Sequence, residues 1–131
     1  PCPVNQVAFL GRELGLPFWA FGENYNFGLP GYRVVGGNAV LSRTPLTAVA
    51  NPSLAGRKPF YDTKNSRRAL FAEAEFGGAK VLLGALHNDS YDVVNNEAQV
   101  RQLLNFIGDR PCVLAGDFNA QYPATAAPAA S

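Results

Sequence analysis

The stretch Cys112-Val-Leu-Ala-Gly-Asp-Phe-Asn-Ala120 decides the fold, because it begins as an apolar run and ends in polar side chains. Its first four residues have the length and composition of a strand whose two faces are both buried. The glycine then interrupts the apolar run, and Asp117 and Asn119 follow at its end. Such a change at the end of a buried strand indicates side chains that are placed for function.

A second apolar run, Lys80-Val-Leu-Leu-Gly-Ala-Leu86, ends in the same way, in His87. Between the two runs, residues 95–107 carry apolar side chains at helical spacing, which predicts a helix that lies on a sheet. If this helix is a crossover connection, the two central strands run parallel. His87, Asp117 and Asn119 then emerge together at one edge of the sheet.

The rest of the chain alternates short elements, which predicts an α/β fold. Residues 68–76 alternate in polarity, as in a strand covered on one face, and Gly77-Gly78 predicts a tight hairpin turn. Before them we expect a helix at 4–14 that stops at Gly15, a strand at 17–21, a loop at 22–30, a strand that enters and leaves a glycine turn at 31–43, a strand at 46–50 and a basic loop at 51–66.

Length and composition limit the possible functions. The 131 residues suffice for one domain, and no apolar run is long enough to cross a bilayer. The net charge of +1 excludes a strongly basic nucleic-acid coat. Between Ser53 and Leu70, however, the chain has a local charge of +4, from five basic residues and one acidic residue: Arg57, Lys58, Lys64, Arg67, Arg68 and Asp62. This segment is compatible with local attraction of a phosphate and equally with a solvated loop.

Each candidate residue also has a purely structural interpretation. Asp117 suits a turn or helix cap, and a single histidine at a strand end, such as His87, is often a packing residue. Asn38 suits a turn with positive φ, and Cys112 suits a buried and inert thiol. No cysteine or histidine cluster has zinc spacing, and no Gly-x-Ser-x-Gly motif occurs.

Five motifs nevertheless occur in a characteristic order: Gly37-Asn-Ala-Val-Leu-Ser-Arg-Thr-Pro45, Arg67-Arg-Ala-Leu-Phe71, Leu86-His87, Glu97-Ala-Gln-Val-Arg-Gln-Leu-Leu104 and Gly116-Asp-Phe-Asn-Ala120. In this order they resemble the endonuclease/exonuclease/phosphatase superfamily. That superfamily includes deoxyribonuclease-type nucleases, abasic-site endonucleases, neutral sphingomyelinases and inositol polyphosphate phosphatases.

The resemblance implies a two-sheet β-sandwich flanked by helices, incomplete at both ends, and hydrolysis of phosphoester bonds with Mg²⁺ or Mn²⁺. By position, Asp117 would orient or deprotonate the attacking water, Asn119 would hold a phosphate oxygen near the metal, and His87 would stabilise the charged transition state. Asp117 and Asn119 are therefore also the expected metal residues. The expected contacts of the substrate phosphate are Arg67, Arg68 and Asn88.

The chain also departs from the family pattern. Family members carry an asparagine on an early strand, a metal-binding glutamate and a terminal Asp-His pair, and none has a counterpart in this sequence. We therefore expect residues 1–121 to be the central part of a single domain of a longer enzyme. Residues 122–131, rich in alanine with proline and threonine, read as a frayed or disordered tail.

The substrate stays open among phosphate esters, with DNA as one possibility. A nuclease-like phosphodiesterase is the first candidate, and a phosphoinositide phosphatase or a sphingomyelinase-like esterase is the alternative within the family. The other alternative is a non-catalytic interaction or structural domain on the same scaffold, because a fold does not fix a function. Nothing in the sequence indicates an obligate protein partner.

Overall fold

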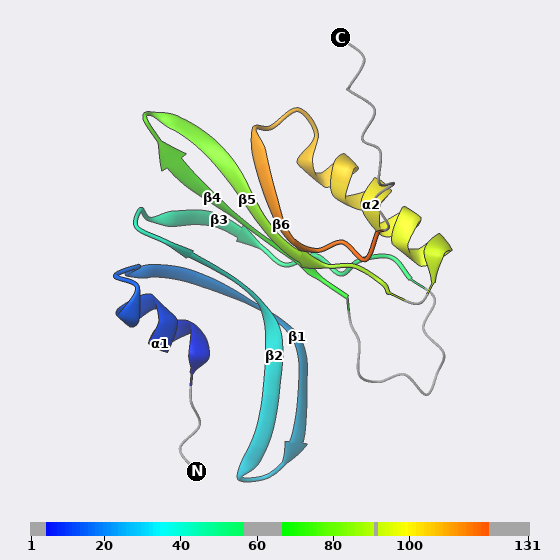
Figure 1. The fold of residues 1–131 in the computed structure, drawn as a ribbon, viewed down its shortest axis with the longest axis horizontal. Helices are drawn as coiled ribbons and strands as arrows, with labels where there is room; N and C mark the ends of the chain where they lie inside the picture. Colours follow the sequence, from blue (N-terminus) through cyan, green and yellow to red (C-terminus); the bar gives the residue numbers. More distant parts are fainter. Residues whose placement is uncertain (1–4, 57–66, 91, 121–131) are drawn as a thin grey trace.

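The structure is a computed structural model that describes residues 5–56, 67–90 and 92–120. It is a mixed α/β fold with two sheets (Figure 1). This confirms the predicted fold class. The elements follow in the order α1 (Gln6–Glu13), β1 (Phe18–Leu29), β2 (Tyr32–Ser42), β3 (Leu46–Ala50), β4 (Ala69–Phe76), β5 (Ala79–His87), α2 (Val93–Ile107) and β6 (Cys112–Asp117).

The strand order places the two apolar runs side by side. β1 and β2 form an antiparallel two-stranded sheet, and the other strands form a sheet of order β3-β4-β5-β6. In this second sheet β3, β4 and β5 are antiparallel, whereas β5 and β6 run parallel with α2 as the crossover between them. The predicted parallel pair is therefore confirmed.

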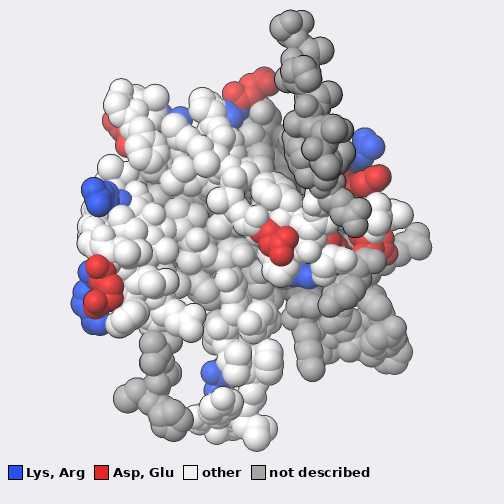
Figure 2. All heavy atoms as spheres, viewed as in Figure 1, with Lys and Arg blue, Asp and Glu red and all other residues white. Residues whose placement is uncertain are grey.

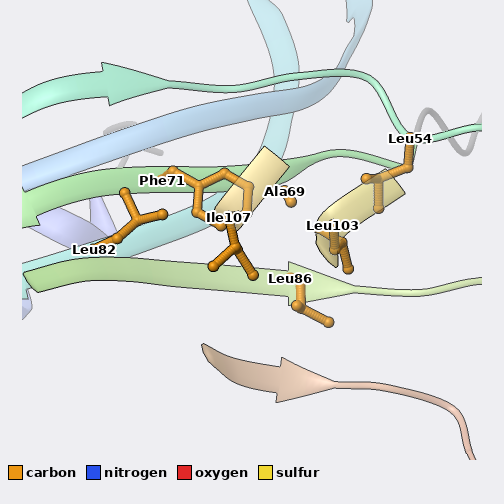
Figure 3. Close-up of a cluster of buried hydrophobic side chains, with 7 residues drawn as sticks. All are labelled: Leu54, Ala69, Phe71, Leu82, Leu86, Leu103 and Ile107. Carbon is orange, nitrogen blue, oxygen red and sulfur yellow. The ribbon is translucent and has the colours of Figure 1, made fainter. Parts of the chain in front are cut away.

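The four-stranded sheet is covered on both faces (Figure 1). On one face, Leu103 and Ile107 of α2 pack on Phe71 and Leu86 of the sheet (Figure 3). On the other face, Ala20 of β1 packs in a smaller cluster with side chains of β4. Because successive side chains of a strand point to opposite faces, β4 contributes to both clusters.

β4 is covered on both faces over its first half, so the prediction of a strand covered on one face only is wrong there. The four residues Ala69 to Ala72 are fully buried, with Phe71 turned toward α2 and Leu70 toward β1 and β2. The predicted alternation appears only toward the far end, where Ala74 is buried and Glu75 is exposed, and Phe76 on the apolar face is half exposed. The reason is tertiary: α2 covers the Phe71 face, which the alternating pattern suggested would be open, while the β1–β2 sheet covers the face of Leu70 and Ala72.

The β1–β2 hairpin is also longer than predicted. β1 continues to Leu29 through the segment predicted as a loop, and β2 passes through Gly36-Gly37 without a turn. A side chain at Gly37 would place its Cβ 1.9 Å from the carbonyl oxygen of Gly22, so glycine allows close strand approach. Asn38 lies within β2 and has no positive φ, so its predicted turn role is wrong.

The predicted helices are present, and local signals fix their ends. Asn5 caps α1 by accepting a hydrogen bond from the Ala8 N–H at 3.0 Å, and Gly15 follows the helix with φ of +64°. Asp92 caps α2, which ends at Gly108 with φ of +58°. The helical spacing of Val100, Leu103, Leu104 and Ile107 predicts that all four side chains face the sheet, which is partly wrong because Leu104 is 60% exposed. The face that α2 buries consists of Asn95, Gln99, Leu103 and Ile107.

β6 was predicted to be a second central strand, but within the described residues it is an edge strand, and Val113 is 57% exposed. Cys112 is half-buried and has a free thiol. Burial raises the pKa of this thiol above its ordinary value, and the nearby Arg110 opposes the shift only in part. None of the helices in the described residues has the length and apolarity needed to cross a bilayer.

Some predictions lie outside the described residues. They concern the tail at 122–131 and most of the basic segment: Arg57, Lys58, Asp62 and Lys64.

Candidate active site

The candidate site lies where β5 and β6 end, at residues 87–89 and 117–119, here called the site edge. The parallel register continues to the pair His87 and Asp117. His87 Nε2 lies 3.8 Å from Asp117 Oδ2, and both side chains are about half exposed to solvent, at 46% and 63%. The structure therefore brings the predicted histidine and carboxylate together at an open surface.

The main chain holds the two strand ends against each other. The Asn88 N–H donates to the Asp117 carbonyl at 2.9 Å, and the Asn119 side-chain amide donates to the Asn88 carbonyl at 3.0 Å. The first bond continues the parallel pairing beyond His87, and the second ties the turn after β6 to the segment after β5. Asn119 is thereby placed beside Asp117 and His87, as the sequence predicted.

Backbone geometry explains the glycine that interrupts the apolar run. Gly116 has φ of +143°, and a Cβ there would lie 1.9 Å from the carbonyl oxygen of Leu86. Asn119 has φ of +48°, a conformation that asparagine adopts more readily than most residues. The Asn119 N–H then donates to Asp117 Oδ1 at 2.9 Å. The turn therefore orients the carboxylate directly.

Amide side chains of α2 anchor the loops behind the site edge, and the sequence analysis missed this role. Gln99 is 1% exposed, accepts from the Asp89 N–H at 2.8 Å and donates to the Ala55 carbonyl at 2.8 Å. Gln102 accepts from the Ala55 N–H at 2.6 Å. The sequence does contain one indication that Gln99 is buried. It lies four residues before Leu103 and therefore on the same face of the helix.

The two arginines predicted to contact phosphate directly precede β4, at the same end of the sheet. Ala69 pairs with Leu86, so Arg68 lies beside the end of β5. Arg68 Nη1 donates to the Asn51 carbonyl at 2.7 Å, and the Arg68 carbonyl accepts from the Asn38 side chain at 2.9 Å. Arg67 is half-buried, and its carbonyl accepts from the Leu54 N–H at 2.8 Å.

Asn88, the third predicted phosphate contact, is placed differently. Its side chain is fully buried, and in the part of the chain that the structure describes its Nδ2 and Oδ1 have no hydrogen-bond partner. The hydrogen bonds of Asn88 at the site edge are made by its main chain, which donates to the Asp117 carbonyl and accepts from the Asn119 side chain. A phosphate contact through its side chain would require the side chain to turn outward.

The donor set at the site edge suits a hard cation only in part. Among residues 5–56, 67–90 and 92–120, no group of three or more His, Cys, Asp or Glu side chains could hold a metal ion. Mg²⁺ commonly uses one or two carboxylates and completes its shell with water and substrate phosphate oxygens. Asp117 provides one such carboxylate. The Asn119 amide donates one hydrogen to Asn88, and its oxygen is the atom that could face a cation.

Charged side chains are dispersed over the face of the molecule shown in Figure 2. Blue and red atoms occur there in small separated groups among uncharged surface. Nucleic-acid binding by electrostatic attraction usually depends on basic residues that gather on one face. Among the described residues on this face, no such gathering of basic side chains is seen.

The comparisons with known proteins agree on the fold. No family model and no curated protein matches the sequence. Among solved structures, an endonuclease/exonuclease/phosphatase from Beutenbergia cavernae has a TM-score of 0.70 and 25% identity, over 87% of this chain and 32% of its own. Sphingomyelinase C from Streptomyces griseocarneus has a TM-score of 0.66 and 18% identity, over 86% and 46%. D. rerio TDP2, complexed with single strand DNA product, has a TM-score of 0.58 and 22% identity, over 88% and 48%.

The chain therefore has the endonuclease/exonuclease/phosphatase fold that its ordered motifs predict. It spans only about a third to a half of the length of these three structures.

Proposed function

We propose that the protein hydrolyses phosphoester bonds, and that a nuclease-like phosphodiesterase is its most suitable class. The observation that carries the proposal is the pair His87 and Asp117, held 3.8 Å apart at the open ends of two parallel strands. The structural likeness to an endonuclease/exonuclease/phosphatase supports it.

The geometry suggests a role for each side chain. The separation of 3.8 Å exceeds a normal hydrogen bond, so the imidazole and the carboxylate can each contact a different atom of one phosphate ester and its attacking water. Asp117 would orient the water or accept its proton, and His87 would donate to the oxygen on which negative charge develops. Asn119 would hold a phosphate oxygen with its second amide hydrogen.

A divalent cation, Mg²⁺ or Mn²⁺, is the proposed cofactor. Asp117 would hold it through a carboxylate oxygen and Asn119 through its amide oxygen, which are hard ligands of the kind these ions prefer. When bound, the ion would neutralise negative charge on the phosphate oxygens. Its remaining ligands would include water and the substrate.

Arg67, Arg68 and Asn88 are the proposed phosphate-binding residues. The Arg68 guanidinium uses one of its five N–H groups on the Asn51 carbonyl, so others remain for a phosphate. Arg67 lies next to it at the start of β4. Asn88 contributes its main chain to the site edge, and a direct contact through its side chain is the least supported of the three.

The structural neighbours suggest substrates to test. DNA is favoured by D. rerio TDP2, which is complexed with single strand DNA product. A sphingomyelinase-like esterase is favoured by the likeness to sphingomyelinase C, and a phosphoinositide phosphatase remains the other alternative. A non-catalytic domain is favoured by one observation, that the described residues form no cluster of three or more metal-binding side chains.

The test is hydrolysis of plasmid DNA, sphingomyelin, a phosphoinositide and a generic phosphodiester by the protein, with Mg²⁺, with Mn²⁺ and with a chelator. We expect turnover of at least one substrate with metal, and its loss with chelator. Asp117→Ala should lower that turnover by ~10²–10⁴-fold, because a positioned base is removed. The matched control is Asp109→Ala, which changes an exposed aspartate just before β6, at the opposite end of the strand.

Two results would contradict the proposal. Wild-type protein that cleaves none of the four substrates with either metal would favour the non-catalytic domain. Equal turnover by Asp117→Ala and wild type would remove Asp117 from the reaction.

A further inference from the structure

Asn96, in the N-terminal half of α2, contacts both halves of the site edge from behind. Its side-chain Nδ2 donates to the Asp89 carbonyl at 2.8 Å and to the Phe118 carbonyl at 2.9 Å. A primary amide has two hydrogens to donate, so both are used here. One side chain therefore ties the segment after β5 to the segment after β6.

The contact with Phe118 reaches Asp117 through one peptide unit. The Phe118–Asn119 peptide is planar and trans, so its carbonyl and its N–H point in opposite directions. The carbonyl accepts from Asn96, and the N–H donates to Asp117 Oδ1 at 2.9 Å. Fixing one end of this rigid unit fixes the direction of the other.

This peptide unit needs such support. Asn119 has φ of +48°, which costs asparagine less than most residues but still depends on the contacts that surround it. Without Asn96, the peptide could rotate, and the hydrogen bond from the Asn119 N–H to the Asp117 carboxylate would weaken. The Asn119 side chain, which depends on the same turn, would move with it.

The contact with Asp89 fixes the other half of the site edge. Asp89 lies two residues after His87, and its N–H is already held by Gln99 of α2 at 2.8 Å. Asn96 holds the carbonyl of the same residue at 2.8 Å. The segments that follow β5 and β6 are thus hydrogen-bonded to the same helix, α2, and this fixes their position relative to each other.

We propose that Asn96 is a positioning residue: through the Phe118–Asn119 peptide and the Asp89 carbonyl it holds Asp117 and Asn119 in register with His87. The catalytic part of this inference rests on the proposed function. Asn96 does not touch the reacting atoms, and its effect passes through main-chain groups.

The experiment combines kinetics with amide hydrogen exchange on the protein and two variants, Asn96→Ala and Asn96→Asp. Alanine removes both donors and favours the helix. Aspartate keeps the shape and suits a position near a helix N-terminus, but it has no hydrogens to donate. We expect kcat to fall about 10- to 100-fold, as when a residue that orients a ligand is lost, with KM nearly unchanged. We also expect faster exchange of the Asn119 amide, measured by NMR.

The matched control is Asn105→Ala, on the same helix. The Asn105 side chain is exposed and makes no hydrogen bond among the described residues, so its replacement should leave kcat and Asn119 exchange unchanged. Unchanged Asn119 exchange in both Asn96 variants would overturn the inference. So would faster exchange with wild-type kcat, or an equal effect in the control. If the wild-type protein cleaves no substrate, the proposed function fails, and Asn119 exchange alone then decides whether Asn96 holds this turn.

Discussion

The two ends of β5 are held in different ways. At its beginning, β5 leaves the turn Gly77-Gly78, whose φ angles of +57° and +82° connect it to β4 without help from elsewhere. At its end, His87 is followed by a segment that is bonded to Asp117 and to α2. The first end is determined by neighbouring residues, whereas the second depends on residues that are distant in sequence. The candidate active site lies at the second end.

The largest expected difference between the two ends is in catalysis. His87→Ala should lower turnover of the cleaved substrate by ~10²-fold or more, because a donor to the charged transition state is lost. Lys80→Ala, at the other end of the same strand, changes a side chain that is 72% exposed and whose Nζ lies 3.8 Å from Glu73 Oε2. It should leave kcat unchanged. Equal loss in both variants, measured by steady-state kinetics, would show that β5 matters for folding and that its site end has no special role.

The next effect concerns stability at the site end. Gln99→Leu keeps a similar volume but leaves the Asp89 N–H and the Ala55 carbonyl without their partner. Because buried polar groups without partners are costly, we expect the free energy of unfolding to fall by about 1–3 kcal/mol in urea titrations. Gln102→Leu should cost less, since Gln102 is more exposed and water can replace its bonds. A Gln99 variant as stable as wild type would show that α2 does not anchor the site edge.

The smallest effect is expected at the turn end. A Cβ at Gly77 would have no atom within 4 Å, so Gly77→Ala creates no steric clash. Its only expected cost is the backbone strain of the positive φ at that position. That strain should cost about 1 kcal/mol of unfolding free energy. Turnover should stay at the wild-type value, because the turn lies at the far end of β5 from His87. A loss of turnover in this variant would contradict the separation of the two ends.

The same contrast explains which parts of the fold were predictable. The Gly77-Gly78 turn and the strand–helix–strand order of β5, α2 and β6 follow from local sequence and were predicted correctly, whereas the burial of α2 and β6 was predicted only in part. The extension of β1 through residues 22–29 was not, because its glycines and asparagines also suit a loop. Only the close pairing of Gly22 with β2 makes them strand residues, and that depends on a partner strand.

The candidate site was predictable to a similar extent. The apolar runs that end in His87 and Asp117, and the crossover helix between them, predict their proximity, which the structure confirms. The roles of His87, Asp117 and Asn119 stay predictions. The contacts of Asn96 and Gln99 were not predicted. A polar amide on a helix is normally interpreted as a surface residue, and the loops that it contacts are distant in sequence.

The most direct test of the account is a double-mutant cycle for His87 and Asp117. It compares kcat/KM of the cleaved substrate for wild type, His87→Ala, Asp117→Asn and the double variant. If both side chains act on one phosphate ester, the double variant should be little slower than the slower single variant, because groups that act as a unit are strongly non-additive. Losses that multiply in the double variant would show that the two side chains act independently, and would contradict a shared site at the ends of β5 and β6.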